Sequence, residues 1–166
     1  MAGTEKALNA GLLAGYLAKR PPGRVTRGGI EFRVSHPDKK TMGDSGVYHD
    51  EWISGRNGGG QETILTGEGA FTRVYAGGVY PESDLVQLGT DYHSVESRLS
   101  FFIKGSGGQT RLDQDYFAVD GDWQYSYEVI ERFPQIQLTT GIEKIDLKGQ
   151  TVFVHLIGVS PITPRG

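Results

Sequence analysis

The sequence of 166 residues contains no cysteine and no apolar stretch that approaches the length of a membrane span. Without cysteine, the chain forms no disulfides, thiolate nucleophiles, iron–sulfur clusters or zinc sites of the cysteine type. A bilayer span needs roughly 20 apolar residues, and the N-terminus lacks the charged-then-apolar layout of a secretory signal. These absences predict a soluble cytoplasmic protein with no membrane partner, in which any catalysis would use oxygen or imidazole groups.

Positive charge is also scarce, because 17 Lys and Arg stand against 20 Asp and Glu, for a net charge of -3. General nucleic-acid binding needs clustered basic residues to neutralise phosphates, so we do not expect it. Residues 1–40 are the exception, with a net charge of +5 against -8 for the rest. This basic segment, which includes Arg24 and Arg27, is either a solvated helix end and loop or a face for an anionic partner.

The common catalytic motifs are missing as well, since there is no Gly-x-Ser-x-Gly elbow, His-Glu-x-x-His helix or Walker sequence. His49, Asp50 and Glu51 are consecutive, and successive strand residues face opposite sides, which argues against a three-ligand metal site. The glycine-rich run 55–60 leads into a predicted strand rather than a helix, so we interpret it as a flexible hairpin loop and not a phosphate-binding loop. We expect no catalytic residue, metal or cofactor.

The residues that are present predict an α+β fold. Helical spacing predicts one helix over 4–19, capped by Thr4 and stopped by two prolines, and another over 92–104, capped by Asp91 or Thr90 and ended by the glycines of 105–108. Short runs of alternating or β-branched residues predict strands at 30–34, 47–53, 63–66, 71–76, 116–119, 123–130, 143–147 and 151–157.

An internal repeat is the most specific signal in the sequence. The pattern acidic-x-aromatic followed by Gly-x-Glu-x-Ile occurs over 50–64 and again, 81 positions later, over 131–145, and the strand that follows repeats at a spacing of 80. We interpret this as a duplication. It predicts a single domain over residues 1–166 with two pseudo-symmetric halves, about 4–80 and 90–159. Each half would be a helix laid on an antiparallel meander, and together they would form one curved or barrel-like sheet.

The repeat draws attention to Glu62 and Glu143, which hold the same place in the two copies. Each is either a structural strand residue or half of a ligand site on the pseudo-twofold axis. Aromatic residues around them could line a small-molecule pocket or equally form a core with polar rims, and a lone histidine such as His155 is more often a hydrogen-bonded core residue. The candidate ligand-binding residues are Trp52, Arg56, Glu62, Tyr75, Trp123, Tyr125, Glu143 and His155.

The order of several residues carries a family resemblance over most of the chain. These residues are Tyr48, Trp52, Gly55-Arg56, Gly60-Gln61-Glu62, Tyr75-Ala76-Gly77 and Val79, and then Asp120-Gly121-Asp122-Trp123, Tyr125, Phe133, Gly141, Glu143, Ile145, Gly149, Val152 and Gly158. The pattern resembles the bacterial domain of unknown function 5680, which occurs alone or C-terminal to XRE-type helix-turn-helix regulators. The chain departs from it where the family commonly has a second Trp and a His-Gly pair, since Phe71 and Ile157-Gly158 stand there instead. The resemblance implies an effector-sensing or interaction module, of which this chain would be the sensor-like part.

From these observations we favour a non-enzymatic module that binds a small, anionic or nucleotide-like molecule between the two halves. One alternative is a protein-interaction modulator, phage- or plasmid-borne, that acts on a host factor through the basic segment. The other is a hydrolase or transferase in which Glu62 or Glu143 is the general base. The sequence leaves the oligomeric state open.

Overall fold

The computed structural model describes residues 2–18, 21–106 and 111–163. Lys19, and the glycines at 107 and 108 that were expected to stop the second helix, lie outside the described residues. The helices are α1 (Ala2–Ala14), α2 (Lys39–Met42), α3 (Glu82–Gln87) and α4 (Tyr92–Gly105). The strands are β1 (Gly23–Arg27), β2 (Ile30–Ser35), β3 (Val47–Ile53), β4 (Asn57–Thr66), β5 (Gly69–Val79), β6 (Tyr116–Asp120), β7 (Trp123–Phe133), β8 (Leu138–Leu147) and β9 (Gln150–Pro161).

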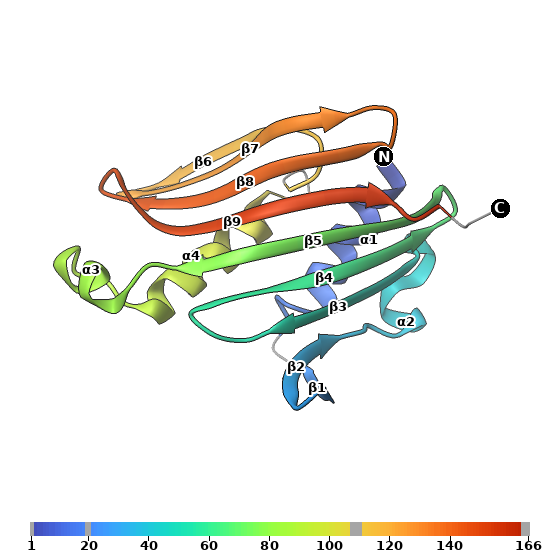
Figure 1. Cartoon of the computed structure of the whole chain (residues 1–166), viewed down its shortest axis with the longest axis horizontal. Coiled ribbons are helices and arrows are strands. Elements are labelled where there is room, and N and C mark those ends of the chain that lie inside the picture. The colour runs from blue at the N-terminus through green and yellow to red at the C-terminus, as the bar shows by residue number, and fades with distance from the viewer. Residues whose placement is uncertain (1, 19–20, 107–110, 164–166) are drawn as a thin grey trace.

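The nine strands form one antiparallel sheet in the order β1-β2-β3-β4-β5-β9-β8-β7-β6 (Figure 1). Two meanders, β1 to β5 and β6 to β9, meet where β5 pairs with β9. The α+β class is therefore confirmed. Of the predicted curved or barrel-like sheet, the barrel-like alternative is wrong, because β1 and β6 are the two edges of an open sheet and do not pair with each other.

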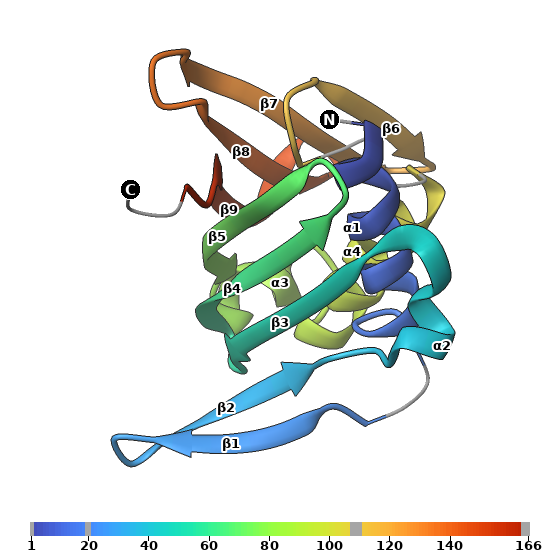
Figure 2. The ribbon, with the colours of Figure 1, turned by 90° about the vertical axis from the view of Figure 1, so that its right-hand side faces the viewer.

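Helices α1 and α4 lie on one face of the sheet, which curves around them (Figure 2). We call this the inner face. Helix α1 buries Leu8 and Leu12 against it, and its Gly11 allows the ring of Tyr48 to approach, because a Cβ at Gly11 would lie 2.1 Å from Cγ of that ring. Helix α4 stacks Phe102 on Tyr125 of β7, with ring centroids 5.4 Å apart. These contacts form the main apolar core.

The first helix differs from its prediction at both ends. Helix α1 begins at Ala2, so Thr4 lies inside the helix, buried, and does not cap it. The helix ends at Ala14, several residues before the prolines. Gly11 lies in its last turn and Gly15 directly follows its end, and glycine is a poor helix former. Asp91 does cap α4, because its side chain accepts a hydrogen bond from the Ser94 amide.

The glycine run 55–60 is also different from the expected flexible loop. The turn covers only residues 54–56, and the glycines at 58–60 belong to β4. A Cβ at Gly60 would lie 2.5 Å from the Tyr75 hydroxyl and 2.7 Å from the carbonyl oxygen of Glu51. The glycine is therefore required because a large aromatic side chain from β5 crosses directly over the strand.

The pairing register aligns only part of the sequence repeat. Gly60 pairs with Trp52 in the first meander, whereas Gly141 pairs with Val129 in the second. Phe133, the expected counterpart of Trp52, lies beyond a bulge between Val129 and Glu131, where the register shifts. The Gly-x-Glu-x-Ile segments of β4 and β8 both lie on interior strands of the sheet. The acidic-x-aromatic segments do not match in register.

Candidate functional site

The centre of the inner face carries charged side chains. Asp50 of β3, Glu62 of β4 and Arg73 of β5 lie opposite one another across three adjacent strands, and all three are buried. Because side chains alternate along a strand, each shares its face with core residues two positions away. A buried charge is costly unless a partner compensates it, so the contacts of each group determine what it can do.

Glu62 has a partner on each carboxylate oxygen. The hydroxyl of Tyr48 donates a hydrogen bond to Oε1 at 2.6 Å, and Nε of Arg73 donates to Oε2. Both partners are fully buried. The Nη1 and Nη2 atoms of Arg73 have no hydrogen-bond partner among the described residues. Glu62 is thus a compensated carboxylate with a hydrogen-bond donor on each oxygen.

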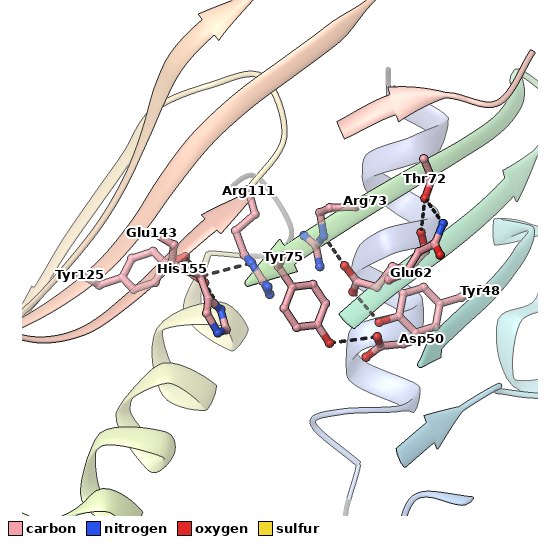
Figure 3. Close-up of polar contacts among 11 residues, drawn as sticks. Tyr48, Asp50, Glu62, Thr72, Arg73, Tyr75, Arg111, Tyr125, Glu143 and His155 are labelled. Atoms are coloured by element: carbon pink, nitrogen blue, oxygen red, sulfur yellow. Dashed lines mark hydrogen bonds and ion pairs between the residues drawn. The ribbon is translucent and has the colours of Figure 1, made fainter. Parts of the chain in front are cut away.

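Glu143 is the centre of a second, similar cluster (Figure 3). The hydroxyl of Tyr125 donates to Oε1 at 2.6 Å, Nε of Arg111 lies 3.1 Å from the same oxygen, and Nδ1 of His155 lies 3.4 Å from Oε2. Burial alone would raise the pKa of Glu143, but Arg111, followed by His155 and Tyr125, outweighs burial and lowers this pKa to about 2. Glu143 is therefore ionised at neutral pH and is a weak base.

Asp50 is the third buried carboxyl, and its surroundings are different. The hydroxyl of Tyr75 donates to Oδ1 at 3.0 Å, while no cation forms an ion pair with Asp50 among the described residues. Burial, and next the charge of Glu62, raise the pKa of Asp50 to about 8, although Tyr75, Arg73 and Arg111 oppose the shift. Asp50 consequently keeps its proton at neutral pH.

A cavity of about 100 Å³ adjoins these groups, between the inner face of the sheet and helices α1 and α4. Asp50, Tyr75, Arg111 and His155 line its interior, and in Figure 3 Tyr75, Arg111 and His155 extend toward one another from different segments. The exposed β3–β4 turn at 54–56 lines its mouth. Aromatic residues complete the wall: Tyr16, Trp52, Tyr92 and Phe153. The cavity is smaller than the roughly 300–1,000 Å³ of drug-sized ligand sites.

Five of the eight residues predicted to bind a ligand line this cavity: Trp52, Arg56, Glu62, Tyr75 and His155. Tyr125 and Glu143 are not among the lining residues; Glu143 pairs with Arg111 and His155, which are, and Tyr125 donates a hydrogen bond to Glu143. Trp123 lies apart from it, in an open depression beside the start of α4, where the guanidinium of Arg98 is 5.4 Å from its ring centroid.

Sequence reasoning missed Arg111 as a site residue. It follows the second helix in an irregular segment without periodicity, and its backbone has a φ of 71°, which is unusual for a residue other than glycine. Its buried guanidinium lies 5.8 Å from the centroid of the Tyr75 ring, over the ring face. Such a costly backbone conformation persists only when its surroundings enforce it, and it occurs often at functional sites.

The basic segment near the N-terminus forms intramolecular pairs. Arg24 lies 3.4 Å from Glu31 within the β1–β2 hairpin, and Arg27 makes two hydrogen bonds, of 2.6 and 3.0 Å, to Glu51 of β3. Both arginines are therefore partly neutralised by this chain itself. Arg20 lies outside the described residues.

Other features of the described chain add no further site. No group of three or more His, Asp or Glu side chains in residues 2–18, 21–106 and 111–163 gathers to hold a metal ion. Within the same ranges, no helix has the length and apolar character to cross a membrane. Comparisons of the chain with protein-family models, curated proteins and solved structures found no match.

Proposed function

We propose that this chain is a non-enzymatic module that binds a small molecule in the cavity between the inner face of the sheet and helices α1 and α4. The observation that carries the proposal is the cavity wall itself, in which the carboxyl of Asp50 and the guanidinium of Arg111 are both buried. Burying apolar side chains would cost less free energy than burying such charged groups. Small-molecule sites combine an apolar wall with a few polar anchors of this kind.

Incomplete hydrogen bonding around the cavity supports the same proposal. Nε of Arg111 and Nδ1 of His155 are buried and have no hydrogen bond of good geometry among the described residues. Buried polar atoms in folded proteins are paired in the great majority of cases. The two atoms lie 3.1 and 3.4 Å from the carboxylate of Glu143, as ion pairs without hydrogen-bond geometry, and their side chains line the cavity in which a polar molecule would bind.

The two alternative functions have weaker support. A protein-interaction modulator acting through the basic segment would have to compete with the contacts that Arg24 and Arg27 make to Glu31 and Glu51. A hydrolase or transferase would need a proton-accepting glutamate. Glu143 is ionised but a weak base, and both oxygens of Glu62 are engaged. The cavity therefore favours binding over either alternative.

The resemblance to the domain of unknown function 5680 is consistent with a sensing module, and we retain it as a proposal.

We also propose that the chain contains two pseudo-symmetric halves and acts in the cytoplasm. The first is supported by a shared arrangement, because Tyr48 and Tyr125 each donate to the glutamate of a Gly-x-Glu-x-Ile segment. Arg73 pairs with Glu62 in register, and His155 with Glu143. The second rests on the absence of cysteine.

A thermal-shift screen of small metabolites tests the binding proposal. A ligand at a hundred times its Kd adds about 2.7 kcal/mol to the free energy of unfolding, which corresponds to a rise in Tm of about 5–10 °C for a chain of this length. Leu12→Phe enlarges a side chain that lines the cavity and should abolish the shift. Leu13→Phe, at the exposed next position of α1, should preserve it. Compounds that stabilise both variants equally, or a screen without any stabilising compound, would refute the proposal.

A further inference from the structure

The three buried carboxyls of the inner face are not equally compensated. Arg73 pairs with Glu62, and Arg111 pairs with Glu143. Asp50 has the neutral hydroxyl of Tyr75 as its hydrogen-bond donor, on Oδ1, and its Oδ2 accepts no hydrogen bond from the described residues. Asp50 is 3 % exposed and lines the cavity. The cavity therefore contains a carboxyl that lacks one cation and has one oxygen available.

The walls around Asp50 suit a positively charged guest. Four aromatic side chains besides Tyr75 line the cavity, and the faces of aromatic rings attract cations; they are Tyr16, Trp52, Tyr92 and Phe153. Glu96 adds a third carboxyl to the lining, after Asp50 and Glu62, and accepts a hydrogen bond of 2.6 Å from Tyr92.

Three basic groups also line the cavity, and their existing contacts limit the electrostatic effect that they have on a bound ligand. Arg111 is paired with Glu143, and His155 lies 3.4 Å from the same carboxylate. Arg56 is exposed at the mouth, where its Nη1 donates to the carbonyl oxygen of Val79 at 3.3 Å. Because Arg73 and Arg111 already have an anion each, an added anion would stay uncompensated. An added cation would be compensated once Asp50 gives up its proton.

From this arrangement we propose that the cavity binds a small alkylammonium group, with the carboxylate of Asp50 as its counter-ion. The proposal rests on the small-molecule function above and names the chemical class of its ligand. A volume of about 100 Å³ is below the roughly 150 Å³ of a cavity that holds benzene. The site would therefore hold about four non-hydrogen atoms. They would be either a short amine or the amino end of a longer molecule whose remainder extends out through the mouth of the cavity.

Binding of this kind has a proton balance that an anionic ligand would not reproduce. An alkylammonium ion arrives already protonated, and Asp50 must lose its proton to the solvent to become the counter-ion. The charged groups that act on Asp50 are Glu62, Arg73 and Arg111, with the Tyr75 hydroxyl hydrogen-bonded to it. With the pKa of Asp50 at about 8, binding should release about 0.9 proton at pH 7, and the apparent affinity should rise about 50-fold from pH 6 to pH 8.

The two tryptophans of the chain give a matched pair of reporters, because Trp52 lines the cavity and Trp123 does not. The experiment is a titration of protein labelled with 5-fluorotryptophan, followed by fluorine NMR, using propylammonium, 1-propanol and propionate as probes of nearly equal size. Propylammonium should shift the Trp52 signal at the lowest concentration and leave the Trp123 signal in place. Calorimetry in buffers of different ionisation enthalpy should measure the released proton.

Two variants assign the effect to the cavity carboxyl. Asp50→Asn keeps the shape of the side chain and should lose the response to propylammonium and the proton release. Glu51→Gln changes the adjacent strand residue, whose side chain pairs with Arg27 away from the cavity, and should behave as wild type. A Trp52 shift caused by propionate or propanol but not by propylammonium would overturn the amine assignment and leave small-molecule binding intact. A Trp52 signal that no probe moves would also overturn it, and the metabolite screen would then decide the wider function separately.

Discussion

Replacing Asp50 by asparagine should make the free energy of unfolding much less dependent on pH. In the folded chain the pKa of Asp50 is raised from 3.8 to about 8, mainly by burial. The folded state therefore binds more protons than the unfolded state between these two values, and stability is lost as the pH rises through that window. Asparagine has the same shape, accepts the same hydrogen bond from Tyr75, and does not titrate.

The size of the effect follows from the two pKa values. Each unit of pH between them costs about 1.36 kcal/mol, and the loss levels off near pH 8. From pH 5 to pH 8, Asp50 should remove about 3–4 kcal/mol from the stability of the wild type. Asp50→Asn should therefore gain this amount relative to wild type over the same interval, which is roughly 7–15 °C in Tm for a chain of this length.

The assay is urea unfolding of wild type and Asp50→Asn at pH 5, 6, 7 and 8, followed by tryptophan fluorescence. Asp122→Asn is the matched control, since Asp122 is exposed in the turn between β6 and β7, and its stability should follow the wild-type curve. If Asp50→Asn and wild type change in parallel from pH 5 to pH 8, then Asp50 is not the protonated buried acid described above, and the reasoning fails.

Three further predictions concern the packing around the cavity. Arg73→Met leaves the carboxylate of Glu62 unpaired and should cost about 3–5 kcal/mol in urea unfolding, whereas adding Glu62→Gln should restore most of it; a double variant no more stable than the single one would contradict this pairing. Gly11→Ala should lower Tm despite its better helix propensity, because the ring of Tyr48 occupies the space of the new Cβ, while Gly105→Ala, with open space around it, should not. The pKa of Glu143 is lowered from 4.5 to about 2, so its contribution to stability is complete above pH 4.5, and about 3 kcal/mol is lost as the pH falls through 2. Acid titration of Glu143→Gln should lack this loss, and an acid limb unchanged from wild type would argue against the ion pair.

The sequence predicted the individual helices and strands better than it predicted whether the sheet closes into a barrel. Every predicted strand is present, because period-two alternation depends on one face of a strand being buried, and each of these strands has such a face. The edge strand β1 was missed, since two of its five residues are arginines and its side chains are mostly exposed. Whether the sheet closes depends on twist and on the lengths of both edges, which no local pattern encodes.

The candidate site was predicted only in part, because only some of its residues carry a local signal in the sequence. Glu62 and Glu143 were found because the repeat places them at the same position in two segments. Asp50 shares its strand face with Tyr48 and Trp52, so a polar residue on an apolar face was the signal that could have identified it. Arg111 had no such signal, because it lies in an irregular segment without periodicity. Only the three-dimensional path of the chain brings its side chain to Glu143.

The most direct test of small-molecule binding in the cavity is native mass spectrometry of the chain purified from a cell lysate. Wild type and the Leu13→Phe control should each carry an added small mass that is released on denaturation, and Leu12→Phe should carry none. An added mass that is equally present on Leu12→Phe would place the ligand elsewhere. A wild-type chain that keeps only its own mass, both from the lysate and after incubation with a metabolite extract, would contradict the claim that the cavity is a binding site.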